Sequence, residues 1–442
     1  MHSVLAPANE LVAFSATRLA DLIRRREVTA VEVVEAHLER IADVNPALNA
    51  IVQLDAEGAL RAARAQPGGP LHGVPFTVKD VIETAGLVAA LGVAERTTYV
   101  PARDATVVAR VRAAGGILLG KTNCPPWGGG SATDNPVYGR TNNPYDLERS
   151  PGGSSGGEAA AIAAGLSPFG LGSDSGGSLR QPAHFCGLAC LKPTAWFVPL
   201  TGMVDDEGDL GAIADPRTQI GPMARFVEDV ELLLSVVGGA GALEPDVPPV
   251  SIGRSADVAL RGMRAAVHTH NGIVEPTRET VESVHAAARA LAAAGVEVEE
   301  RPLPAGGHEL TVEIWRSYVG RLRSDEVYRV FRRWDAYRRD LLAFLEPYDL
   351  IVCPVAPVPA FEHEEGFGGD GVSFTTPFSL TGWPAAVVRA GSSPEGLPIG
   401  VQLVARQWRD DVALAAAAEV ERTLGGWQPP DATRRGAFVP AE

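Results

Sequence analysis

The sequence predicts an α/β protein in which a largely parallel or mixed β-sheet lies between helices. Two observations support this prediction. From about residue 65 onward, short apolar segments of strand length alternate with longer amphipathic segments of helix length. The chain also has 442 residues, of which 45% are hydrophobic and 21% charged. A chain of this size and composition buries a large core without help from disulfides or metals.

The first fifty residues have the spacing of helices. Leu19, Leu22 and Ile23 lie on one helical face, and Thr29 with Glu32 predicts a capping box at the start of a second helix. We therefore expect residues 1–64 to form a helical N-terminal extension. Residues 65–442 are expected to form the main domain, in one structural unit with the extension.

The main domain is expected to alternate between strands and helices. The expected strands are 74–78, 117–119, 264–267, 296–299, 350–355 and 398–404, and the expected helices are 105–114, 158–164, 274–294 and 411–424. Two segments rich in Gly and Pro interrupt the pattern. Residues 237–250 are a candidate boundary between subdomains, and residues 354–371 are a candidate mobile loop near the substrate.

Composition excludes several classes of function. The formal charge of −15 argues against a nucleic-acid partner, because phosphate binding needs a basic face. No stretch approaches eighteen apolar residues, so we expect no membrane span. The four cysteines are too scattered for a disulfide framework or a metal site, which favours a cytoplasmic protein with reduced thiols. We expect no metal and no cofactor, and we leave a homo-oligomer open.

Lysine is rare and confined to one part of the chain. Of 39 basic residues only three are lysines, namely Lys79, Lys121 and Lys192, and all three lie in its glycine-rich region. Arginine keeps its proton inside proteins, whereas a buried lysine can lose its proton and act as a base. Each lysine is therefore a candidate for proton transfer, with chance or a packing site too small for guanidinium as the alternatives.

Two common sequence patterns fall on this region and are set aside. Residues 115–122 match a phosphate-binding loop of the Walker A type, but the residues inside the pattern are strand-like and the following Asn-Cys-Pro-Pro does not begin a helix. Residues 152–156 match a nucleophile elbow, but the segment before them is turn-like and no histidine has a distinctive context. Neither pattern has the structural surroundings that its chemistry requires.

A third set of motifs agrees with one family in order and in spacing. The motifs are His72-Gly-Val-Pro-Phe-Thr-Val-Lys79-Asp80, Gly120-Lys-Thr-Asn123, Gly128-Gly-Gly-Ser-Ala-Thr-Asp-Asn-Pro136, Pro151-Gly-Gly-Ser-Ser-Gly-Gly-Glu158, Gly172-Ser-Asp-Ser-Gly-Gly-Ser-Leu-Arg180 and Leu191-Lys-Pro-Thr194. Together they resemble the amidase-signature family over roughly residues 15–425, most specifically between 72 and 194. The resemblance implies a central mixed β-sheet covered by helices on both faces, and makes the main domain the catalytic one.

The resemblance also implies a role for each site residue. It makes Ser178 the nucleophile, Ser154 the bridging serine after a cis peptide bond, and Lys79 the base, whose pKa burial must lower. The oxyanion donors and supporting residues that it implies are Ser175, Gly176, Gly177 and Ser178 for the oxyanion, Gly128 for the substrate amide, and Asp174 and Arg180 as hydrogen-bonding supports.

The expected activity is hydrolysis of a small-molecule amide to a carboxylic acid and ammonia or an amine, through an acyl-enzyme on Ser178. The alternatives are the glutaminase (A-type) component of a tRNA-dependent amidotransferase and, less favoured, a non-catalytic scaffold. The chain departs from the family pattern at residues 195–198, where Ala-Trp-Phe-Val replaces the Tyr-Gly-Arg-Val of many members. Trp196, Trp315 and Trp383 are candidates either for an apolar substrate pocket or for the core.

Overall fold

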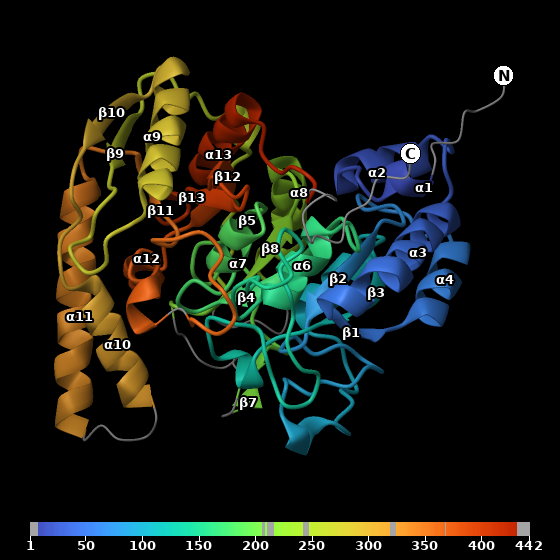
Figure 1. The fold of residues 1–442 in the computed structure, drawn as a ribbon. Coiled ribbons are helices and arrows are strands. Elements are labelled where there is room, and N and C mark those ends of the chain that lie inside the picture. Colours follow the sequence, from blue (N-terminus) through green and yellow to red (C-terminus); the bar gives the residue numbers. More distant parts are fainter. Residues whose placement is uncertain are drawn as a thin grey trace.

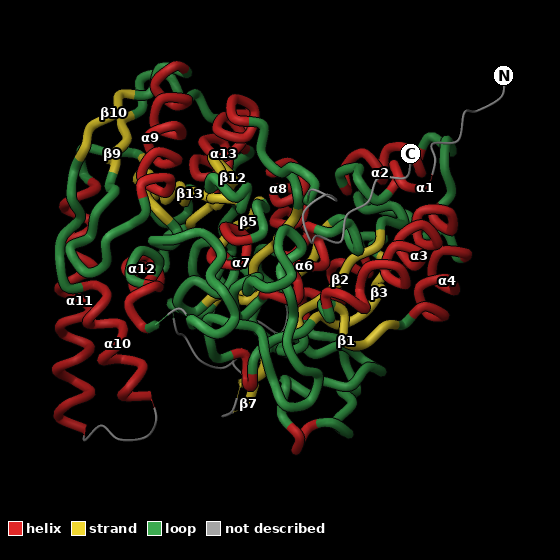
Figure 2. The backbone as a smooth tube through the Cα atoms, in the orientation of Figure 1, coloured by secondary structure: helices red, strands yellow, loops and turns green. Residues whose placement is uncertain are grey.

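An eleven-stranded mixed sheet forms the centre of the computed structural model, which describes residues 8–205, 208–209, 216–241, 247–318, 324–366 and 368–430. Its strand order is β1-β3-β2-β4-β8-β5-β12-β13-β11-β9-β10. Figure 1 shows the sheet running from the blue N-terminal part to the gold and orange C-terminal part, and Figure 2 shows helices on both of its sides. The predicted mixed sheet covered by helices on both faces is therefore confirmed.

The strands of this sheet are short. Their bounds are β1 (Ile51–Leu54), β2 (Pro75–Lys79), β3 (Ile117–Thr122), β4 (Phe169–Asp174), β5 (Ala189–Lys192), β8 (Gln219–Ala224), β9 (Arg264–Val267), β10 (Glu297–Glu300), β11 (Leu350–Pro354), β12 (Ala385–Ser392) and β13 (Pro398–Ala405). A separate pair is formed by β6 (Val204–Asp205) and β7 (Gly208–Asp209). All six predicted strands are present, and their ends agree with the prediction to within three residues.

The helices described are α1 (Ala8–Leu11), α2 (Ala16–Arg24), α3 (Ala30–Leu48), α4 (Ala56–Arg64), α5 (Thr106–Ala113), α6 (Gly156–Ala163), α7 (Arg180–Phe185), α8 (Val227–Val237), α9 (Arg278–Ala293), α10 (Gly307–Tyr318), α11 (Ser324–Leu345), α12 (Thr376–Thr381) and α13 (Asp410–Leu424). The four predicted helices of the main domain correspond to α5, α6, α9 and α13. None of the helices in the described part of the chain is long and apolar enough to span a membrane.

The N-terminal residues share their core with the sheet. The predicted capping box is present, because the Thr29 hydroxyl accepts from the Glu32 N–H at 3.1 Å and the Glu32 carboxylate accepts from the Thr29 N–H at 2.7 Å. Strand β1 pairs antiparallel with β3, and α3 packs Val34 and Leu48 into one hydrophobic cluster with residues of β3. Burying these side chains together is the main force that holds this part of the chain against the sheet.

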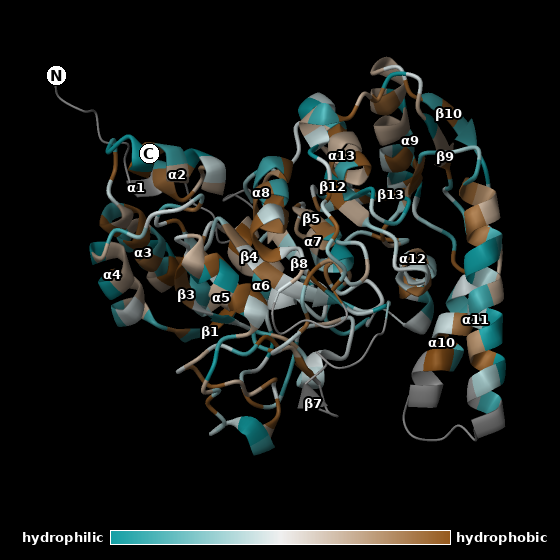
Figure 3. Ribbon diagram, turned by 180° about the vertical axis from the view of Figure 1, so that it is seen from behind, coloured by the Kyte–Doolittle hydropathy of each residue, from teal (hydrophilic) through white to brown (hydrophobic). Residues whose placement is uncertain are grey.

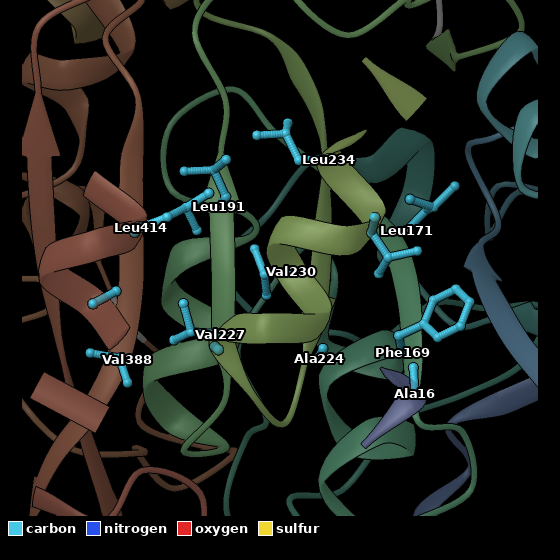
Figure 4. Close-up of a cluster of buried hydrophobic side chains, with 14 of the residues drawn as sticks. Ala16, Phe169, Leu171, Leu191, Ala224, Val227, Val230, Leu234, Val388 and Leu414 are labelled. Atoms are coloured by element: carbon cyan, nitrogen blue, oxygen red, sulfur yellow. The ribbon is translucent and has the colours of Figure 1, made fainter. Parts of the chain in front are cut away.

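The largest hydrophobic cluster lies between the central strands and the helices that cover them. Figure 4 shows Val227, Val230 and Leu234 of α8 lying over Leu171 of β4 and Leu191 of β5. Figure 3 shows the same pattern from behind, with the central strands largely apolar and more hydrophilic residues on the outer helices. This packing fixes β4, whose carboxyl end carries the residues described next.

Candidate active site

Three segments that are distant in the sequence meet at the carboxyl ends of β2 and β4. Strand β2 runs parallel to both β3 and β4, so its last residue, Lys79, lies at the same edge of the sheet as Asp174, the last residue of β4. The loops at this edge enclose a cavity of about 620 Å³ whose lining includes Gly128, Ser154 and Ser178. Ligands of α/β sheets commonly bind at such an edge.

The side chain of Lys79 is fully buried and is held by two serine hydroxyls. Its Nζ lies 2.6 Å from the Ser154 Oγ and 2.9 Å from the Ser173 Oγ. Burial lowers the pKa of Lys79 to about 8, and the nearby acidic groups Cys124, Asp174 and Glu158 limit the fall. The amine therefore loses its proton far more readily than an exposed lysine does.

Ser154 lies in the turn that precedes α6. The peptide bond between Gly153 and Ser154 is cis, as the family resemblance implied. Gly152 before it has a φ of +85°, and a Cβ there would lie 2.7 Å from the Phe185 ring, so this position requires glycine. The turn brings the Ser154 hydroxyl to the Lys79 amine at the cavity wall.

Ser178 lies in the loop between β4 and α7 and is partly exposed to the same cavity. The Ser178 carbonyl accepts a hydrogen bond of 3.1 Å from the Ser155 N–H, which links the two serine-bearing loops. Among the residues that the structure describes, none forms a hydrogen bond with the Ser178 hydroxyl. Hydrogen bonds between catalytic groups often tighten only when substrate binds. Lys79, Ser154 and Ser178 thus border one site, with one of the two links already formed.

A buried ion pair supports the loop that carries Ser178. The carboxylate of Asp174 accepts from the Arg180 Nε and Nη2, both at 2.9 Å, and neither side chain is exposed to solvent. The same carboxylate accepts from the N–H groups of Gly177 at 2.7 Å and Leu179 at 3.1 Å. Asp174 therefore fixes the direction of several amides in this loop, which is the supporting role that the sequence predicts for this pair.

The donor set predicted for the oxyanion needs one correction. The N–H of Gly177 already donates to Asp174, so it is not free to bind an oxyanion. Its φ is +134°, and a Cβ there would lie 2.6 Å from the Thr375 hydroxyl. Gly177 is therefore required for its backbone conformation and its lack of a side chain. The loop amides of Ser175, Gly176 and Ser178 remain as candidate donors.

Comparison with known proteins identifies the family. A family model for amidases matches residues 32–326 and 311–414. The chain belongs to the amidase family. Its relatives include the A-type subunit of glutamyl-tRNA(Gln) amidotransferase from Roseiflexus sp. (strain RS-1), which is 35% identical and aligns over 91% of this chain and 94% of its own length. Fatty-acid amide hydrolase 2-A of Danio rerio is 33% identical over 96% of this chain and 91% of its own length.

Solved structures agree with this assignment. The structure of 6-aminohexanoate cyclic dimer hydrolase complexed with substrate matches with a TM-score of 0.81 at 30% identity, over 96% of this chain and 99% of that chain. The protein is therefore an amidase-signature hydrolase that acts on amide C–N bonds. The mixed α/β fold predicted from the sequence is that of these amidase structures.

The structure of this amidase adds residues that the sequence did not single out. Ser173 is the second hydroxyl on the Lys79 amine. Thr375, from a distant part of the chain, donates through its hydroxyl to the Gly176 carbonyl, and its own carbonyl accepts from Arg180 Nη1 at 2.8 Å. The sequence could have indicated Ser173, because it directly precedes Asp174 in the Gly172–Arg180 motif. No local pattern reveals Thr375.

Two of the three tryptophans named from the sequence are not among the described residues that line the cavity. Trp196 and Trp383 are absent from its described lining, and Trp383 packs in a core cluster with Phe378. The side chain of Trp315 lies outside the described residues. Trp127 lines the cavity instead. It follows two prolines and precedes three glycines, a context that reads as a turn and gives no sign of a substrate wall.

The other two lysines of this amidase are also fully buried. Lys121 Nζ lies 3.9 Å from the Asp80 carboxylate and contacts the Ile82 carbonyl, and Lys192 Nζ donates to the Pro193 carbonyl at 3.1 Å. Burial lowers the pKa of Lys192 to about 7. Neither amine contacts the Ser154 hydroxyl, so their positions favour the packing alternative over proton transfer for these two lysines.

Proposed function

We propose that this amidase hydrolyses a small-molecule amide through an acyl-enzyme on Ser178, with Ser154 and Lys79 carrying the proton. The Ser178 Oγ attacks the amide carbon, its proton passes to the Ser154 Oγ, and the proton of Ser154 passes to the neutral Lys79 amine. The oxyanion is stabilised by loop amides next to Gly176. The single observation that carries the proposal is the buried Lys79 amine lying 2.6 Å from the Ser154 hydroxyl.

The second half of the reaction reverses the proton path. The C–N bond breaks as the Lys79 ammonium returns its proton through Ser154 to the leaving nitrogen, which an amide requires because a bare amide anion leaves poorly. Water then attacks the ester carbon, its proton follows the same path, and Ser178 regains its hydroxyl hydrogen. The products are a carboxylic acid and ammonia or an amine.

We also propose that the protein is located in the cytoplasm, where thiols stay reduced. Its four cysteines are free and buried, which supports this location.

Covalent labelling tests this proposal directly. A fluorophosphonate probe is expected to add one label per chain, at Ser178, and to stop amide hydrolysis in proportion. Ser178→Ala should take up no label, whereas Ser155→Ala, which alters a neighbouring serine hydroxyl outside the proposed relay, should still be labelled. Peptide mass spectrometry locates the label, and a label on any other serine would rule out Ser178 as the nucleophile.

A second candidate function is glutamine hydrolysis as the A-type component of a tRNA-dependent amidotransferase. The similarity to the Roseiflexus amidotransferase chain favours it. Such a component passes ammonia to partner chains, whereas the proposed amidase acts alone. Ammonia release by the isolated chain from simple amides but not from glutamine would support the first function, and the reverse preference would support the second.

The rate is expected to rise with pH because the base must be neutral. With the pKa of Lys79 lowered to about 8, the amine is mostly protonated below that pH and mostly neutral above it. We expect log kcat to climb by about one per pH unit between about pH 6 and pH 7.5, and to level off above about pH 8.5. Steady-state rates in a constant-ionic-strength buffer series measure this, and a flat profile would contradict a lysine base.

Ser173→Ala removes one of the two hydroxyls that hold the Lys79 amine. We expect kcat to fall by about tenfold, the equivalent of one hydrogen bond of about 1.4 kcal/mol, with a smaller change in KM. The midpoint of the pH profile should move as well, because the environment of the amine changes. Ser173→Thr keeps a hydroxyl and should restore most of the rate. If both variants matched the unmodified protein, Ser173 would have no part in positioning the lysine.

A further inference from the structure

We propose that the substrate of this site is an uncharged amide carrying a flat apolar group, and that Trp127 is the residue on which this group packs. The proposal rests on the amide hydrolysis proposed above and names its substrate class. It follows from three features of the cavity: the chemistry of its wall, the backbone conformation of Trp127, and the residues that hold the indole from behind.

The described part of the cavity wall is neutral and includes several large apolar side chains. Its apolar side chains are those of Val81, Trp127, Met203, Val204 and Val372. None of the described lining residues is Asp, Glu, Lys, Arg or His. A charged substrate group entering this wall would lose its hydration without gaining a counter-charge from these residues, which is strongly unfavourable. The volume of about 620 Å³ is in the range of sites that enclose small organic ligands.

The polar groups of the wall are also uncharged. The hydroxyls of Ser175 and Thr218 are hydrogen-bonded to each other at 2.8 Å, and the side chain of Gln181 donates to the Gly371 carbonyl at 3.3 Å. Such groups orient a neutral amide by hydrogen bonds but do not neutralise an ammonium or a carboxylate. L-glutamine carries both of these charges on its α-carbon. A neutral amide with an apolar substituent therefore fits this wall better than glutamine does.

Trp127 is held in a backbone conformation that bulky residues rarely adopt. Its φ is +56° and its ψ is +18°, in the left-handed region that glycine favours. The Trp127 N–H donates to the Leu91 carbonyl and the Gly128 N–H donates to the Pro125 carbonyl, both at 2.9 Å. Strained residues of this kind persist where the surroundings enforce them, and they concentrate at functional sites. The strain here directs the largest side chain of the described wall to the cavity.

Arg96 braces the indole from outside the cavity. Its guanidinium carbon lies 5.9 Å from the centre of the Trp127 ring and 4.3 Å from that of the Tyr99 ring. Arg96 Nε donates to the Ala89 carbonyl at 3.1 Å, and its Nη2 lies 3.9 Å from the Glu83 carboxylate. Arg96 is not among the residues that line the cavity, and its charge is paired with Glu83. The indole is thereby a rigid, flat surface, which suits an aromatic or alicyclic ring better than a flexible chain.

The test compares kcat/KM for phenylacetamide, acetanilide, acetamide and L-glutamine. The better of the two aromatic amides is expected to exceed acetamide by about 10- to 100-fold, as burial of one ring predicts. Glutamine is expected to be poorer than either aromatic amide. In Trp127→Ala the ratio of aromatic amide to acetamide should fall by about tenfold, mainly through KM, and Trp127→Phe should restore most of this ratio.

Two further readouts keep the outcomes apart. Val372→Asp places a carboxylate at another apolar position of the wall, and it should also lower the ratio of aromatic amide to acetamide if the wall binds the apolar group. Absence of fluorophosphonate label and of all hydrolysis would overturn the proposed function itself. Normal labelling with glutamine as the best substrate, or a Trp127→Ala variant whose ratio is unchanged, would overturn the assignment of Trp127 and of the substrate class while leaving amide hydrolysis intact.

Discussion

Replacing Lys79 by methionine is expected to lower kcat by at least about 10²- to 10⁴-fold while the protein stays folded. The Lys79 amine is the only base within hydrogen-bond reach of the Ser154 hydroxyl among the described residues, so without it neither serine can lose its proton at neutral pH. Methionine fills a similar volume without a charge that must be desolvated. Water from the cavity replaces the hydrogen bonds that Ser154 and Ser173 lose, because both residues line it.

Lys121→Met is the matched control, since Lys121 is equally buried but faces Asp80 and not the serines. Its loss leaves the buried Asp80 carboxylate without its cation, so this variant should lose several kcal/mol of unfolding free energy. Its folded fraction should still take up the fluorophosphonate label. The results expected for the two variants are therefore opposite. Lys79→Met should be stable and inactive, whereas Lys121→Met should be unstable but still able to react with the probe. Equal loss of rate and stability in both would indicate that Lys79 is structural.

Much of the sheet was predictable because its strands are short apolar runs bounded by turn residues. Strand β4 was not predicted, since its sequence Phe-Gly-Leu-Gly-Ser-Asp reads as a glycine loop. The structure explains these glycines: a Cβ on Gly170 would overlap the Glu158 side chain of α6, and one on Gly172 would lie 2.8 Å from the Ser155 hydroxyl. The glycines thus allow α6 to pack closely on the strand. Such a contact between segments leaves no periodic signal in either of them.

In the site as well, the sequence does not reveal features of single residues that depend on contacts between distant segments. Motif register predicted Lys79, Ser154 and Ser178 as one site, and the structure places these three residues around one cavity. The engagement of the Gly177 amide by Asp174 could not be read from the motif, which does not give the direction of a backbone N–H. Trp127 was missed for a related reason: the role proposed for it depends on a positive φ and on Arg96, and both are consequences of tertiary packing.

Arg180→Ala is expected to lower the free energy of unfolding by about 3–5 kcal/mol. Arg180 and Asp174 are both fully buried and make two hydrogen bonds to each other, so removing one partner leaves an unpaired charge in the interior. Arg180 also donates to the Thr375 carbonyl and the Ser379 hydroxyl, which ties α12 to α7. Denaturant titration measures the loss, and the rate should fall too because Asp174 orients the loop of Ser178.

An exposed pair provides the comparison that assigns this loss to burial. Arg339 and Asp335 form an i,i+4 ion pair on α11 with most of each side chain in solvent, so Arg339→Ala should change the unfolding free energy by less than about 1 kcal/mol.

Acid provides a second check on Asp174. Burial is the largest single effect and by itself would raise the pKa of Asp174, but the charge and hydrogen bonds of Arg180, together with Lys192 and the Leu179 N–H, outweigh it and hold the pKa below its usual value. The stability due to the pair is therefore present at neutral pH and disappears only as the pH falls through that lowered pKa. In Arg180→Ala the attraction of the guanidinium is gone, so burial should raise the pKa of Asp174. The loss of unfolding free energy should therefore become smaller as the pH falls and the carboxylate takes up a proton. Equal losses for Arg180→Ala at neutral and acid pH would show that packing, and not the buried charge, sets the stability of this loop.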